Sequence, residues 1–203
     1  MANRISRKVA AARGSSDNGK PAASKQAPHS RTQTQKKRVA QRPAQRTAQL
    51  KQAALIERAV SLAVESHRGQ VDKYHQPYIL HVLGVAARCR STEEKIVAFL
   101  HDVVEDTSTT FDDLRAMGFP ERVVVAVDCL TRRRGEYYTA FVERIAPNPL
   151  ARAVKLADLE DNMDIRRSNR PMKVKDAARM EKYRKAWQYL ADLHAQGGVP
   201  IAE

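Results

Sequence analysis

Apolar residues recur at helical spacing through most of this chain, and this pattern limits its fold more than any other feature. From about residue 48 onward, Leu55, Ala59, Leu62 and Ala63 fall on one stripe of a helix. No stretch of the 203 residues shows the sustained apolar and polar alternation that is typical of a half-buried strand. We therefore predict an all-α fold, a compact multi-helix bundle.

Start signals divide this pattern into separate helices. Ser91 with Glu94, and Thr110 with Asp113, have the spacing of capping boxes. Each pair comes directly before a run that has helical character. Further helices are predicted over residues 120–130, 137–145, 150–167 and 175–198.

The first 47 residues differ from the rest in composition and charge. Of the formal net charge of +13, +12 falls on residues 1–51, so the remaining 152 residues are nearly neutral. This start is rich in Ala, Gln, Ser and Pro and has no aromatic residue, so it cannot bury enough apolar area to offset its chain entropy. We predict a disordered basic tail over residues 1–47 and one domain over residues 48–203.

The tail has three possible roles. The first is a solvated linker, and the second is a non-specific contact to the phosphates of RNA or DNA through counterion release. The third is a mitochondrial transit peptide, although this segment has few large apolar residues with which to form an amphipathic face. The two cysteines, Cys89 and Cys129, are too few for a disulfide framework. No apolar run is long enough to span a membrane, and no secretory signal follows Met1. We expect a cytoplasmic protein with no membrane partner.

The segment AFLHDVVEDT, residues 98–107, places charged groups on a helix that would otherwise complete a core. His101 and Asp102 are adjacent, and Glu105 and Asp106 return to the face of Asp102 one turn later. Without a cation, such a group of acids would repel one another or remain unsatisfied in a core. The pattern therefore predicts a bound cation, and a metal ion is one object that His101 and Asp102 can both touch.

Two other predicted helices each offer one more candidate ligand. His81 lies among Ile79, Leu80 and Val82, and Asp158 interrupts an apolar stripe in the same way. A single histidine near apolar residues is more often a core group satisfied by a hydrogen bond. The ordered combination of a histidine, a His-Asp pair and a later aspartate is more specific than either residue alone.

Four motifs resemble the HD-superfamily hydrolase domain of RelA/SpoT proteins and of the small alarmone hydrolases. They are HRGQ at 67–70, PYILHVLGVA at 77–86, AFLHDVVEDTSTTFDDL at 98–114 and VKLADLEDN at 154–162. The resemblance covers roughly residues 50–195. It implies an all-α fold, one divalent metal ion and removal of the 3′-diphosphate from ppGpp and pppGpp. The metal ligands that it implies are His81, His101, Asp102 and Asp158.

The same resemblance implies roles for three further residues. Glu105 and Asp106 match the acidic pair that positions and activates the attacking water, and Asn162 matches the asparagine that contacts the nucleotide sugar. A set of two histidines and two aspartates suits Mn²⁺, the usual ion of the family, or alternatively Fe²⁺ or Zn²⁺. The ion would lower the pKa of the water, and a carboxylate such as Glu105 would accept its proton.

One loop departs from the family pattern. Where the family has an arginine that stacks on guanine, this chain has Asp72, whereas the following lysine is retained as Lys73. An aspartate neither stacks on a base nor offsets phosphate charge. Either Tyr74 or His75 offers a replacement face for the base, or both are ordinary loop residues.

Further cations are candidates for phosphate contacts. Lys155 falls on the face of Asp158, and Arg132, Arg133 and Arg134 form a run that would suit a polyphosphate. Both features are also typical of solvated surface cations.

The function that we predict is (p)ppGpp 3′-pyrophosphohydrolysis by a metal-activated water. The first alternative is the same chemistry on another nucleotide phosphate. The second is a nucleic-acid-associated module in which the helical domain is a metal-stabilised scaffold.

Overall fold

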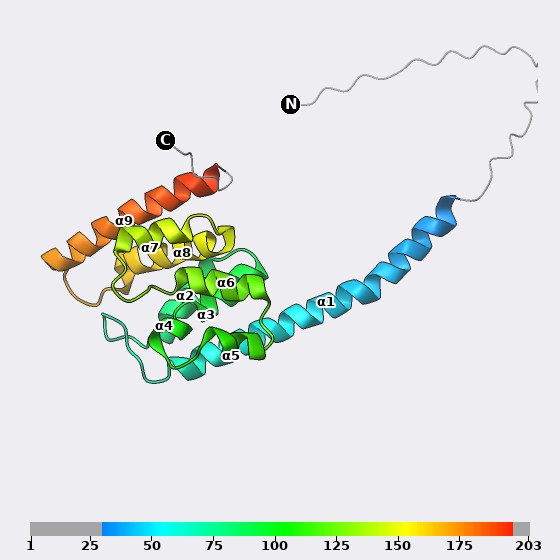
Figure 1. The fold of residues 1–203 in the computed structure, drawn as a ribbon, viewed down its shortest axis with the longest axis horizontal. Coiled ribbons are helices and arrows are strands. Elements are labelled where there is room, and N and C mark those ends of the chain that lie inside the picture. The colour runs from blue at the N-terminus through cyan, green and yellow to red at the C-terminus, as the bar shows by residue number, and fades with distance from the viewer. Residues whose placement is uncertain (1–29, 197–203) are drawn as a thin grey trace, which may run out of the picture. The chain divides into compact units, whose positions relative to one another are not determined.

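The structure is a computed structural model that describes residues 30–196, and every regular element in that range is a helix (Figure 1). An isolated antiparallel bridge between Val71 and Pro77 is the one extended pairing found there. The all-α prediction is confirmed. The elements are α1 (Ser30–Ser66), α2 (Ile79–Arg88), α3 (Thr92–Leu100), α4 (Val103–Asp106), α5 (Phe111–Ala116), α6 (Glu121–Leu130), α7 (Tyr138–Ile145), α8 (Pro149–Met163), the 3₁₀ turn η1 (Ile165–Arg167) and α9 (Val174–Ala195).

The chain divides into two units, Met1–Arg42 and Pro43–Glu203. Residues 1–29, which make up most of the predicted tail, lie outside the described residues. Residues 30–47 were predicted to lack regular structure, but they form the first part of α1. The physical reason is their content of Gln, Lys and Arg, which are strong helix formers even without an apolar face.

Capping side chains fix the residues at which the helices near the site begin. The hydroxyl of Ser91 accepts a hydrogen bond from the Glu94 amide at 3.1 Å, and Thr110 does the same for Asp113 at 3.2 Å, so both predicted capping boxes are present. The side chain of Asn148 accepts hydrogen bonds from the first amides of α8. These caps satisfy amides that the helix itself leaves unpaired.

The core lies where α8 meets its neighbours, because α8 packs against α2, α3, α6, α7 and α9. Side chains with no exposed surface come from several of these helices, for example Val85, Leu100, Val127 and Leu190. Burying a side chain of this size contributes about 1.5–3 kcal/mol to stability. The bundle therefore fixes α2, α3 and α8 against one another.

The chain leaves α8 earlier than the sequence predicted. Helix α8 ends at Met163, and Asp164 then caps η1 by accepting a hydrogen bond from the Arg166 amide at 3.0 Å. The predicted helix over residues 150–167 was therefore wrong in its last turn, because the Asp164 side chain competes for backbone amides. No helix within residues 30–196 is both long enough and apolar enough to cross a membrane.

Candidate metal centre

Three helices bring candidate metal ligands together from distant parts of the sequence. His81 lies on α2, His101 follows the last residue of α3, and Asp158 lies on α8. All three are buried, and their ligand atoms lie within 4.8 Å of one another. His81 Nε2 is 3.3 Å from Asp158 Oδ1. These three residues could therefore hold one metal ion.

Asp102 is the predicted fourth ligand, and it lies at the same place. Its Oδ2 atom is 3.0 Å from His101 Nε2 and 3.9 Å from His81 Nε2. The hydroxyl of Tyr78 also donates a hydrogen bond to Oδ2. The structure thus brings all four predicted ligands together, with Asp102 the most exposed of them, at 20% of its side chain.

Both histidines are oriented by their second ring nitrogen. His81 Nδ1 lies 2.7 Å from Asp161 Oδ2, and His101 Nδ1 lies 2.7 Å from the carbonyl oxygen of Ala98. In each ring, Nε2 is then the atom directed at the shared space. His101 Nε2 is buried without a hydrogen-bond partner, although Asp102 lies nearby. A buried nitrogen of this kind fits a metal ligand.

The electrostatics of the centre favour positive charge. Burial lowers the pKa of His81, but Asp158, Asp161 and Asp102 outweigh burial and raise that pKa to about 9. The pKa of His101 is also raised, because Asp102 and Asp158 again outweigh burial. Nitrogen and carboxylate donors in such surroundings match the ligand preferences of divalent transition metals.

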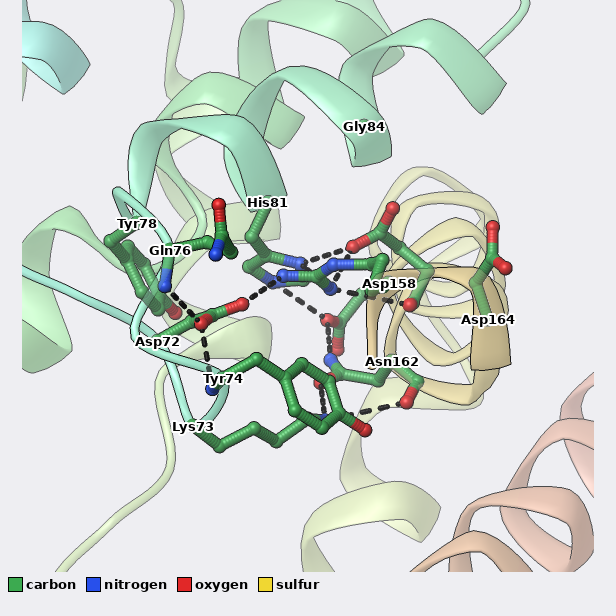
Figure 2. A network of polar contacts seen from close by, with 12 residues as sticks. Asp72, Lys73, Tyr74, Gln76, Tyr78, His81, Gly84, Asp158, Asn162 and Asp164 are labelled. Carbon is green, nitrogen blue, oxygen red and sulfur yellow. Dashed lines mark hydrogen bonds and ion pairs between the residues drawn. The ribbon is translucent and has the colours of Figure 1, made fainter. Parts of the chain in front are cut away.

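Asp158 has two further partners on its own helix. Lys155 Nζ lies 2.7 Å from its Oδ2 atom. Asn162 Nδ2 donates to its Oδ1 atom at 2.6 Å (Figure 2). Asn162 Oδ1 in turn accepts a hydrogen bond from Lys73 Nζ at 2.9 Å. Lys155 is therefore tied to a predicted ligand, and Asn162 and Lys73 extend the network to the loop before α2.

A cavity of about 380 Å³ opens over these groups. Its wall combines cations, acids and aromatic rings, which suits a ligand that carries both phosphate and ring groups. The cations on the wall are Lys73, Arg132, Lys155, Arg167 and Lys182, and the rings are Tyr78, Tyr138, Phe141 and Tyr183.

The two predicted catalytic acids differ in position. Glu105 lines the cavity, and its Oε2 atom accepts a hydrogen bond from the Arg132 amide at 2.9 Å. Partial burial raises the pKa of Glu105. Asp106 is exposed like Glu105, and burial and Asp102 likewise raise its pKa, but it is not part of the cavity wall. The geometry thus supports Glu105 better than Asp106 as a group that meets a ligand.

The predicted arginine run is split in the same way. Arg132 is exposed and lines the cavity, whereas Arg133, which is also exposed, does not line it and lies 3.7 Å from Asp128. Arg134 is also exposed and does not line the cavity. Only Arg132 of the three is placed to meet a bound phosphate.

The loop that departs from the family pattern has its own arrangement. Asp72 Oδ1 accepts hydrogen bonds from the amides of Tyr74 and Gln76 at 2.8 and 2.9 Å, and Oδ2 lies 2.8 Å from Arg167 Nη2 (Figure 2). Tyr74 is buried and His75 is exposed, and neither lines the cavity. Of the two alternatives for these residues, their positions favour ordinary loop residues over a replacement face for the base.

Sequence reasoning missed several residues of the site. Asp161 and Arg167 flank the metal ligands, and Lys182 and Tyr183 reach the cavity from α9. The sequence held one signal for Asp161, which is the glycine at position 84 inside the apolar helix α2, directly opposite Asp161. A glycine inside a helix that is otherwise apolar often marks a close approach.

Comparison with known proteins gives several relatives, although no family model matches the sequence. An Aquifex aeolicus protein named guanosine-3′,5′-bis(diphosphate) 3′-pyrophosphohydrolase is 34% identical over 120 residues, which is 53% of this chain and 17% of that protein. A Xenopus tropicalis protein of the same name, MESH1, is 46% identical over 71 residues, which is 30% of this chain and 39% of that protein.

One solved structure has a similar fold. It is described as a metazoan ortholog of SpoT that hydrolyses ppGpp, and it matches with a TM-score of 0.57 and 25% identity over 68% of this chain and 85% of that chain. The present chain spans a small part of the larger relatives, 17% of the Aquifex aeolicus protein.

Proposed function

Because the helical domain of this chain belongs by sequence and by fold with the HD-type alarmone hydrolase domains, we propose that it removes the 3′-diphosphate from ppGpp and pppGpp. One observation carries this proposal. His81, His101, Asp102 and Asp158 converge beside a cavity whose wall is rich in cations and rings. This arrangement fits a metal-dependent phosphohydrolase.

The same four residues are the proposed ligands of one divalent ion. We propose Mn²⁺ first, with Fe²⁺ and Zn²⁺ as alternatives, because these ions also bind nitrogen and oxygen ligands. When bound, the ion would supply Lewis acidity at the scissile phosphate and lower the pKa of a nearby water.

Glu105 is the proposed proton acceptor for the attacking water. It lines the cavity three residues after Asp102, and its raised pKa makes it a stronger base than an ordinary surface glutamate. The hydrogen bond from the Arg132 amide holds Oε2 in place. Asp106 lies outside the cavity wall, so its proposed role is limited to its negative charge, which helps to raise the pKa of Glu105.

The cations on the wall are the proposed phosphate contacts. Burial lowers the pKa of Lys73 to about 8, and its Nζ is already held by Asn162. Arg132 can grip phosphate oxygens with its guanidinium, and Lys155 can shift from Asp158 toward a phosphate as a point charge. Asn162 would then stand near the sugar, one turn from Asp158.

A second candidate substrate is another nucleotide that carries a phosphate chain. The observation that favours it is Asp72, which occupies the position expected for a guanine-stacking arginine and is engaged with Arg167. The aromatic wall of Tyr138 and Tyr183 offers contact area to any nucleobase.

Turnover of purified chain tests both candidates. With Mn²⁺ present, we expect release of diphosphate from ppGpp and pppGpp at a higher kcat/KM than the hydrolysis of a panel of other nucleoside polyphosphates. Activity should vanish with a chelator, return with Mn²⁺, and be absent from His101→Ala. Absence of diphosphate release from ppGpp, with hydrolysis of another nucleotide, would replace the first substrate by the second.

A further inference from the structure

Asp161 stands out as a buried carboxylate that is not one of the predicted metal ligands but touches one of them. It is 3% exposed and lies three residues after Asp158 on α8. Its Oδ2 atom is 2.7 Å from Nδ1 of His81 on α2. Helix α8 therefore supplies one predicted ligand and also contacts the ring of another.

Two arginines from different elements hold this carboxylate. Arg88, the last residue of α2, donates from Nη1 to Asp161 Oδ1 at 2.8 Å, and Arg167 in η1 donates to Oδ2. Arg88 Nη1 also donates to the carbonyl oxygen of Gly84 at 2.8 Å. Charge-assisted hydrogen bonds on both oxygens compensate the burial of the charge and fix its direction.

The groups around Nδ1 of His81 determine whether this ring nitrogen carries a proton. Arg167 Nη1 lies 3.2 Å from His81 Nδ1, and an arginine nitrogen can only donate. The shared acceptor is therefore Asp161 Oδ2, to which both Nδ1–H and Nη1–H donate. With Nδ1–H held by Asp161, Nε2 is the nitrogen that would give up its proton and present its lone pair to the proposed ion.

Gly84 makes room for this arrangement. A Cβ atom at position 84 would overlap Asp161 Oδ1 and would lie 3.3 Å from Arg88 Nη1. A glycine in the middle of a helix costs up to about 1 kcal/mol relative to alanine. The absence of a side chain here lets the Asp161 carboxylate approach α2 closely.

We propose that Asp161 is a positioning residue that fixes the metal ligand His81, and that Gly84, Arg88 and Arg167 fix Asp161 in turn. This inference rests on the proposed metal site. A carboxylate that orients a ligating histidine keeps the ring in one tautomer and one direction, and its loss typically weakens metal affinity by about 10–100-fold.

Titration of metal-free protein with Mn²⁺ in a calorimeter tests the role of Asp161. We expect Asp161→Asn to weaken Mn²⁺ affinity about 10–100-fold. At saturating Mn²⁺, the kcat of this variant should recover most of its wild-type value, which a damaged fold would not allow. Asp164→Asn is the matched control, because Asp164 also binds Arg88 but does not contact His81.

The control should keep its Mn²⁺ affinity within about twofold of wild type. Gly84→Ala is the second variant, which displaces the carboxylate without removing it, and it should weaken Mn²⁺ affinity as well. If Asp161→Asn does not fold, the Mn²⁺ affinity of Gly84→Ala tests the role of Asp161 instead. Unchanged affinity in these variants, or an equal loss in Asp164→Asn, would overturn the role of Asp161. Failure of the wild-type chain to bind Mn²⁺ would instead overturn the proposed metal site itself.

Discussion

Asp72 and Arg167 are 95 positions apart in the sequence, and their side chains meet at 2.8 Å. The pair joins the loop before α2 to the turn η1 after α8. Arg167 also reaches Asp161, so one guanidinium holds both the loop that carries Lys73 and the carboxylate beside the candidate metal centre.

Asp72→Asn should destabilise the protein through this pair. The amide keeps an acceptor for the loop amides but loses the charge that faces Arg167, and a lost hydrogen bond to a charged, mostly buried partner costs about 1.5–3 kcal/mol. Urea unfolding measures the difference. Asp128→Asn is the control, since Asp128 pairs only loosely with exposed Arg133 and should shift stability by less than about 0.5 kcal/mol. Equal midpoints for both variants would contradict a structural role for the pair.

Glu105→Gln should lower kcat while leaving KM nearly unchanged. The glutamine keeps the shape and the hydrogen bond from the Arg132 amide but cannot accept a proton, so a loss of about 10²–10⁴-fold is expected. Steady-state kinetics on ppGpp measure the change. Glu121→Gln, at an exposed glutamate paired with Arg115, is the matched control. Retention of more than a tenth of the activity would exclude Glu105 as the proton acceptor.

The dependence of kcat on pH should reflect the ionisation of Glu105. Partial burial raises the pKa of Glu105, with Asp102 and Asp106 adding to the effect. A base must be deprotonated, so activity should be present above this raised pKa and be lost as the pH falls through it. The midpoint of kcat at saturating Mn²⁺ should lie above about 4.3, the ordinary value for glutamate. A midpoint at or below that value would argue against Glu105, provided that Mn²⁺ remains bound.

Lys155→Met should destabilise the metal-free protein more than the Mn²⁺-loaded protein. Lys155 and Asp158 form a largely buried ion pair, and removing one partner of such a pair costs about 3–5 kcal/mol. A bound cation at Asp158 would offset part of that cost. Thermal unfolding with and without Mn²⁺ measures both states, and Lys185→Met serves as an exposed control. A loss of the same size in both states would show that the ion does not share the charge of Asp158.

Removal of residues 1–42 should separate hydrolysis from the nucleic-acid contact that was one of the open roles of the basic segment. This segment carries eleven Lys and Arg residues and one acid, and the second unit begins at Pro43. We expect kcat/KM for ppGpp to remain within about twofold, because every residue of the proposed site lies beyond the cut. Any salt-sensitive binding of the intact chain to RNA or DNA should be lost with this segment. Undiminished nucleic-acid binding by the shortened chain would place that contact in the helical unit.

Much of the fold was predictable because its signals are local. The capping pairs Ser91–Glu94 and Thr110–Asp113 need only the residues of one turn, and the structure forms both. The candidate ligands were visible because each interrupts an apolar helical stripe. Their convergence needed the packing of α2, α3 and α8, which the resemblance supplied and the periodicity did not.

The parts that could not be predicted depend on long-range contacts. The position of Arg167 follows from the end of α8 at Met163, where Asp164 caps a new turn. The burial of Tyr74 depends on a loop held by Asp72 and by distant Arg167. No spacing rule within a short window contains either relationship.

The missing side chain at Gly84 makes two positions of the protein depend on each other. Any residue larger than glycine at 84 would need a smaller or differently directed group at 161, and a change at 161 would leave space beside α2. A larger residue at 84 should therefore be tolerated better together with a smaller residue at 161 than alone.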